Sequence, residues 1–301
     1  MTSTIFEVLP TLSSRDDIVD DPILREAADR AYYASRTGPW TVLPCSVAYC
    51  SLSQMITSEE QAELLSQAER IAQQTGRPQD KILAEQFKPD RELRGQLEYL
   101  FDLGNWSPFF KSEPGKKYAT MLQMLQYPFS RGSIHIPAQE KVTVDDKPII
   151  NPQYYLGPGE IDKKVMALGQ RMTDRICKTE PLAKIVRGRV FPSPETESNE
   201  THYEDFVSKY TITDWHRRFP FSVIYMKLTL AAVGTCAMGG RGGAQAGVVD
   251  DRLRVYGVKG LRVVDASIMP MQIGAHIQAT VYAIAEKASA MIREDWNSVQ
   301  K

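Results

Sequence analysis

Apolar residues recur at helical spacing in four segments of the first 180 residues, and this spacing predicts four helices. The predicted helices cover residues 22–34, 58–75, 80–103 and 162–177. Pro22 stands in the first turn of the first helix, which suits its fixed backbone angle. Ser58 and Gln61 form a capping-box pattern at the start of the second, and Gly76 ends it. The apolar faces of these helices are typical of core packing and indicate no chemistry.

Three other segments have the pattern of extended chain. Residues 5–9 and 116–136 are predicted strands, and the second contains the alternating run SRGSIHI. Residues 147–156 are also extended, interrupted by two prolines. Helices together with these strands predict an α+β fold in which helices cover an antiparallel sheet.

The stretch 233–292 has a different pattern. A glycine-rich turn at 239–247 leads to a short apolar run at Val248 and Val249, and a second run at 261–264 ends at Asp265. Two strands are predicted here. His276 follows Pro270, and the apolar positions after it predict a helix through about Ile292.

A strand that ends in aspartate, a loop and a helix N-terminus together supply oxygen acceptors and backbone N–H donors. Such a set suits the polyol or phosphate groups of a nucleotide cofactor. The spacing alone leaves two alternatives open: Asp265 could only cap a turn, and His276 could be a core histidine.

Composition excludes several classes of protein. The net charge of −1 argues against a nucleic-acid partner, which normally meets a basic face. No apolar run has the length of a membrane span. The four cysteines lack metal-ligand or disulfide-framework spacing, so no metal site is predicted and free thiols are expected. Residues 1–11 do not resemble a signal peptide, and no compartment is assigned.

Several motifs resemble, in order, the glucose-methanol-choline (GMC) family of FAD-dependent oxidoreductases. They are GTCAM, AGVVDDRLRVYGVKGLRVVDAS, IMP and HIQATVYAIAEKA, preceded by YPFSRGSIHI and INPQYYL. The resemblance implies that residues 1–232 form a substrate-binding region and that residues 233–301 complete an FAD-binding domain with a strand, a loop and a helix. No GxGxxG follows a strand in this chain, so the glycine-rich part of that domain is expected to lie outside it.

The family's catalytic histidine directly precedes the GTCAM-like signature. Counted straight back from Val233, that position is Ala231, which cannot move a proton. TITDWH, which ends at His216, resembles the family's residues up to and including the histidine, and residues 217–232 then stand in place of one proline. We prefer this second alignment. A short intron read through in frame would explain the extra residues, and a genuine insertion is the alternative.

The resemblance implies a role for each candidate residue. His216 would be the general base and His276 the second active-site residue, which orients the alcohol beside the flavin. Asp265 and Ala266 would contact the polyol chain of FAD. Ile277, Gln278 and Thr280 would lie near the isoalloxazine ring. The expected substrate is a small alcohol of unspecified identity, and the electron acceptor and oligomeric state are not predicted.

Three functions are consistent with these observations. The first is oxidation of an alcohol (CH–OH donor) by hydride transfer to flavin, with this chain as the C-terminal part of the enzyme. The second is a truncated, non-catalytic fragment that does not hold flavin. The third is a lyase or cyclase of the same family that keeps FAD without redox chemistry.

Overall fold

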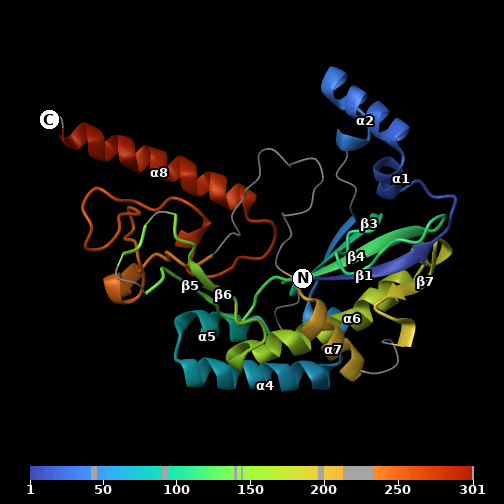
Figure 1. Ribbon diagram of the computed structural model, residues 1–301. Helices are drawn as coiled ribbons and strands as arrows, with labels where there is room; N and C mark the ends of the chain where they lie inside the picture. The colour runs from blue at the N-terminus through green and yellow to red at the C-terminus, as the bar shows by residue number, and fades with distance from the viewer. Residues whose placement is uncertain are drawn as a thin grey trace. The chain divides into compact units, whose positions relative to one another are not determined.

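The structure is a computed structural model and describes residues 1–41, 46–89, 94–138, 141–143, 145–195, 200–212 and 233–299. The chain forms two compact units, whose helices and strands are labelled in Figure 1. The first unit comprises residues 1–67, 86–125 and 160–212. Within the described part, the second comprises residues 68–85, 126–159 and 233–299.

An antiparallel sheet is the centre of the first unit, as predicted. Its five strands follow the order β2-β3-β4-β1-β7. The strands are β1 (Thr2–Val8), β2 (Ser46–Cys50), β3 (Leu97–Leu103), β4 (Lys117–Leu125) and β7 (Val186–Phe191). Most of β1, β3 and β4 is buried on both faces, which makes these three strands the core of the unit.

Helices of the first unit come from two parts of the chain, residues 1–67 and 160–212. They are α1 (Arg15–Asp20), α2 (Pro22–Ser35), α3 (Leu52–Met55), α6 (Glu160–Cys177) and α7 (Glu200–Tyr210). The first half of α4 (Ser58–Thr75) also belongs to this unit. The capping box of α4 is one residue earlier than predicted, because Thr57 and Glu60 exchange the two hydrogen bonds.

Helix α6 packs closely on the sheet through Gly169. A Cβ at this position would lie 2.2 Å from Leu97 Cδ1 and 2.5 Å from Gln123 Nε2. The buried Tyr99 hydroxyl donates to the carbonyl of Gly169 at 2.9 Å, and the Gln123 amide donates to that of Met166 at 2.7 Å. Glycine therefore allows the helix backbone to touch β3 and β4 directly.

The second unit has little sheet. It contains α5 (Pro78–Glu85), β5 (Ser133–His135), β6 (Ile149–Asn151) and α8 (Gln278–Val299), and β5 pairs with β6. α8 confirms the helix predicted near the C-terminal end. No helix in the described part of the chain combines the length and apolar character needed to cross a membrane.

Three predicted elements are wrong. The region 80–103 is not one helix: α5 ends at Glu85 and residues 97–103 form the central strand β3. A strand buried on both faces has a continuous apolar run that periodicity cannot distinguish from a buried helix. The predicted strands at 248–249 and 261–264 form only isolated bridges, Met238 to Val249, Val249 to Val255 and Arg254 to Arg262. Left-handed turns at Leu253, Gly257 and Gly260 interrupt the chain too often for a longer ladder.

Candidate functional site

Asp265 caps a short turn in the second unit. Its side-chain Oδ1 accepts the backbone N–H of Ser267 at 2.8 Å and thereby begins a 3₁₀ turn at Ala266–Ile268. Asp265 is exposed and Ala266 is buried. Oδ2 has no hydrogen-bond partner in the described part of the chain. One carboxylate oxygen therefore holds the turn, and the other can accept a hydrogen bond from a ligand hydroxyl.

The GTCAM segment lies beside this turn. The backbone N–H of Cys236 donates to the carbonyl of Ser267 at 3.1 Å, and that of Met238 donates to the carbonyl of Ile268 at 2.9 Å. Gly234 has a φ of 86°, which favours glycine, and a Cβ there would lie 3.6 Å from the carbonyl oxygen of Met269. The two most specific parts of the sequence pattern are thus hydrogen-bonded to each other.

His276 is exposed and stands two residues before α8. The carbonyl of Ile277 accepts the N–H of Val281 at 3.0 Å, so the helical hydrogen bonds begin at Ile277. Ile277 and Thr280 are half-buried, and Gln278 is exposed. The first-turn N–H groups of a helix have no acceptor within the helix and carry partial positive charge, which suits electron-rich ligand atoms.

A small apolar core connects the Asp265 turn to α8. Its buried members are Val249, Leu253, Ile268 and Ala288, with Val255, Val263, Val264 and Ile284 packed against them. Arg252 and Arg262 both form ion pairs with Asp295 near the C-terminal end of α8. In Figure 1, α8 lies next to the orange segment that carries these turns. The Asp265 turn and α8 consequently belong to one packed assembly, and His276 lies two residues before that helix.

Two residues to which the sequence assigned no role, Gln126 and Tyr127, also contact this site. The N–H of Ala275 donates to the side-chain oxygen of Gln126 at 2.6 Å, and Gly274 lies against the ring of Tyr127. Both contacts join segments almost 150 residues apart, and no motif or periodicity predicts them. His216 and the residues 217–232 lie outside the described residues, so their arrangement stays a prediction.

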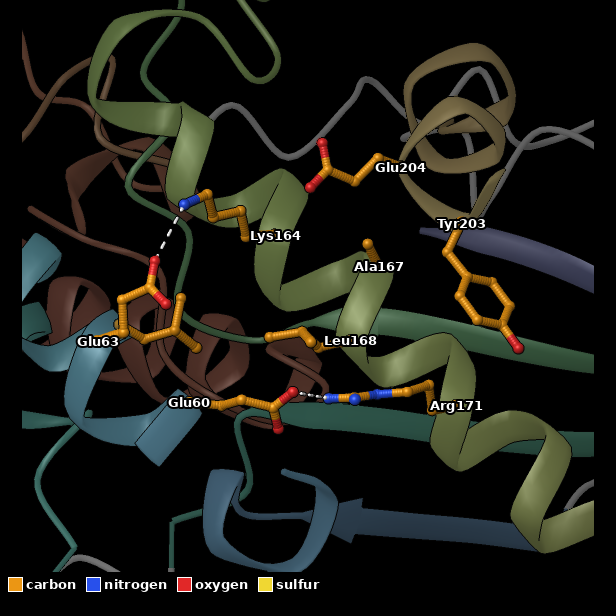
Figure 2. A pocket seen from close by; sticks show the side chains of 9 residues that line it. Glu60, Glu63, Lys164, Ala167, Leu168, Arg171, Tyr203 and Glu204 are labelled. Carbon is orange, nitrogen blue, oxygen red and sulfur yellow. Dashed lines mark hydrogen bonds and ion pairs between the residues drawn. The ribbon is translucent and has the colours of Figure 1, made fainter. Parts of the chain in front are cut away.

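A separate pocket of about 170 Å³ lies in the first unit between α4, α6 and α7 (Figure 2). Glu60 pairs with Arg171 at 2.7 Å, and Glu63 pairs with Lys164 at 3.6 Å. Its wall combines these charges with Leu64, Ala167, Leu168, Tyr203 and Glu204. Glu204 pairs with Lys163 at 3.5 Å, so each charged side chain of the lining has an ion-pair partner, and we assign the pocket no chemistry.

Comparisons with known proteins identify the family of this chain. A family profile described as GMC oxidoreductase matches residues 128–285, more than half of the chain. The chain belongs to the GMC oxidoreductase family.

A curated relative agrees with this assignment, and two solved structures share the fold. Dehydrogenase mpl7 of Monascus purpureus is 30% identical over 315 residues, an alignment that covers 98% of this chain and 46% of the relative. A structure of a formate oxidase variant from Aspergillus oryzae has a TM-score of 0.73 at 20% identity, covering 99% of this chain and 46% of that one. A fungal aryl-alcohol oxidase has a TM-score of 0.67 at 19% identity, covering 98% and 48%. The chain spans about half the length of these proteins.

Proposed function

We propose that this chain supplies part of the active site of an FAD-dependent enzyme that oxidises an alcohol to a carbonyl compound. The observation that carries the proposal is an assembly in which the Asp265 turn and α8, the helix that begins two residues after His276, pack on one small core. The 30% identical relative is named a dehydrogenase, which supports oxidoreductase chemistry in general. The choice of an alcohol as substrate is our inference from the family resemblance.

The donors and acceptors of the assembly fit FAD. The polyol chain of FAD offers hydroxyl groups, and Asp265 Oδ2 is an acceptor without a partner in the described part of the chain. Ala266 would contact the same polyol chain. The isoalloxazine ring offers carbonyl oxygens, and the first turn of α8, which contains Gln278 and Thr280, offers N–H donors. Ile277 would pack against the ring.

Bound FAD would supply the acceptor for the hydride that leaves the alcohol carbon. The protein has to remove the hydroxyl proton in the same event, and a neutral imidazole within hydrogen-bond reach of the hydroxyl can take it. We assign this proton to His216. We assign to His276 a hydrogen bond with the alcohol oxygen, which fixes the orientation of the C–H bond that breaks.

We also propose a separate role for each of two segments of the chain. Residues 1–232 would bind the substrate, and residues 233–301 would complete the FAD-binding domain. The pyrophosphate of FAD is normally held by a glycine-rich loop between a strand and a helix. Because no such loop motif occurs in these 301 residues, we expect them to bind FAD weakly by themselves. A non-catalytic fragment that does not hold flavin is the alternative.

The test is anaerobic reduction of the flavin in the holoprotein that carries this chain. Aliphatic and aromatic primary alcohols should bleach the flavin absorbance in a single turnover. His276→Ala should retain the flavin and slow the bleaching by about 10² to 10⁴-fold, the range for a group that assists proton transfer or orientation. His202→Ala is the matched control, because His202 is an exposed histidine on α7 that contacts the carbonyl of Glu195.

The bleaching rates of the wild type and the two variants decide between these possibilities. Bleaching of the wild type and of His202→Ala, together with slow bleaching of His276→Ala, supports the proposal. Flavin that no alcohol reduces would refute alcohol oxidation and favour a non-redox member of the family. Equal rates in all three proteins would refute the role of His276.

A further inference from the structure

The loop before α8 contains a strained residue next to His276. Ala275 has a φ of 79°, in the left-handed region that residues with a Cβ rarely adopt. Such a conformation costs of the order of 1 kcal/mol or more and persists only where surrounding contacts impose it. Ala275 is also exposed, so burial of its methyl group does not hold it in place. A specific contact to the backbone has to do so.

That contact is the hydrogen bond with Gln126. The side-chain oxygen of Gln126 accepts the N–H of Ala275 at 2.6 Å. Gln126 is only 5% exposed. A buried acceptor has little freedom to move, so it fixes the position of the amide that it binds.

A second contact holds the preceding residue. A Cβ at Gly274 would lie 2.4 Å from the hydroxyl oxygen of Tyr127 and 2.8 Å from its Cζ. The backbone of the loop thus touches the tyrosine ring so closely that a side chain at this position would displace the ring. Gln126 thus contacts Ala275, and its neighbour Tyr127 contacts Gly274. His276 directly follows these two loop residues.

We propose that Gln126 is a positioning residue that sets the place of His276 by binding the backbone of Ala275. The inference rests on the proposed function of His276 in alcohol oxidation. Gln126 does not touch the reacting atoms in this account. It acts through the backbone, and its loss lets the Ala275 conformation relax and moves the imidazole.

Three variants separate this role from a general effect on folding. Gln126→Met keeps the length of the side chain and removes the acceptor. Gln126→Glu restores an acceptor oxygen. Gln96→Met is the matched control, because Gln96 is another buried glutamine, 1% exposed, whose side-chain amide has no partner in the described part of the chain.

The first measurement needs no catalysis. Hydrogen–deuterium exchange of the Ala275 amide in the holoprotein should become about tenfold faster in Gln126→Met, a change expected when one hydrogen bond is lost. Gln126→Glu and Gln96→Met should exchange at nearly the wild-type rate. Unchanged exchange in Gln126→Met would overturn the inference.

The second measurement is the rate of flavin reduction by an alcohol. Gln126→Met should lower the limiting rate at least tenfold. The alcohol concentration for half-saturation should stay within about threefold of the wild-type value. Gln126→Glu should recover most of the rate. The double variant Gln126→Met/His276→Ala should be no slower than His276→Ala, because residues that act through one another are not additive.

The outcomes distinguish the two hypotheses. If His276→Ala is slow and Gln126→Met reduces flavin at the wild-type rate, the inference fails and the proposed function stands. If His276→Ala reduces flavin as fast as the wild type, the proposed role of His276 is refuted, whatever the result for Gln126→Met. A double variant that is slower by the product of the two single effects would assign Gln126 an independent role and would also overturn the inference.

Discussion

Replacing Asp102 by asparagine should make the stability of the protein less dependent on pH. Asp102 lies in β3 and is 5% exposed. Its Oδ2 has no partner in the described part of the chain, while the Trp106 side chain donates a hydrogen bond to the carboxyl group. Burial raises the pKa of Asp102 from its ordinary value of 3.8 to about 6, and the charge of Arg15 offsets only part of this effect.

The magnitude follows from the difference in pKa between the two states. Between pH 3.8 and about 6, the folded protein binds the Asp102 proton more tightly than the unfolded chain does. A rise in pH through this range therefore favours unfolding. A difference of about 2 in pKa, at about 1.4 kcal/mol for each pKa unit, corresponds to about 3 kcal/mol in total. About 2 to 3 kcal/mol of this contribution is lost by the wild type between pH 4 and pH 7.5, because pH 4 already lies above the unfolded pKa.

Urea unfolding followed by circular dichroism at pH 4, 5, 6 and 7.5 measures this effect. The stability of Asp102→Asn minus that of the wild type should increase by about 2 to 3 kcal/mol across the range, because asparagine does not titrate. Gln96→Met, which alters a buried amide without a titratable group, should differ from the wild type by a constant amount. A constant difference for Asp102→Asn would refute the reasoning.

Three further predictions concern the first unit. Gly169→Ala should destabilise the protein by about 1 to 3 kcal/mol, since the new methyl group would overlap buried side chains of the sheet. Gly188→Ala should cost little, because nothing lies within 4 Å of the new Cβ. Urea titration compares the two variants. Arg189→Met should cost about 3 to 5 kcal/mol in the same assay, because it leaves the buried carboxylate of Asp174 without its ion pair; a loss below about 1 kcal/mol would contradict this. Burial raises the pKa of Cys177 to about 12, so this thiol should resist a disulfide reagent at pH 8 until the protein unfolds, and rapid labelling of the native protein would contradict its burial.

The sequence was sufficient to predict the elements whose pattern is local. Amphipathic spacing predicted α2, α4, α6 and α8, since each of these helices follows that spacing over several turns. The antiparallel sheet was also predicted, although β3 was taken for a helix because its residues are buried on both faces. Predicting β3 required knowledge of its neighbours, β2 and β4, which lie elsewhere in the sequence.

The candidate site was only partly predictable for a similar reason. The motifs indicated Asp265 and His276. The structure shows that Oδ1 of Asp265 caps a turn, and the contact of Asp265 with a cofactor stays a prediction. The support from Gln126 was not predictable, since it depends on a hydrogen bond between residues 149 positions apart. A glutamine after a strand has no sequence signature of this role.

The central claim is that His216 and His276 form one catalytic pair, and the sequence of the transcript between the codons for His216 and Gly240 tests it most directly. We predict that the mature transcript joins His216 to Val233 through a single proline codon, which would put the histidine directly before the Gly234 turn that is hydrogen-bonded to the Asp265 segment. A transcript that encodes residues 217–232, with the same residues found by peptide mapping of the native protein, would contradict the assignment of His216 as the base and favour a non-catalytic chain.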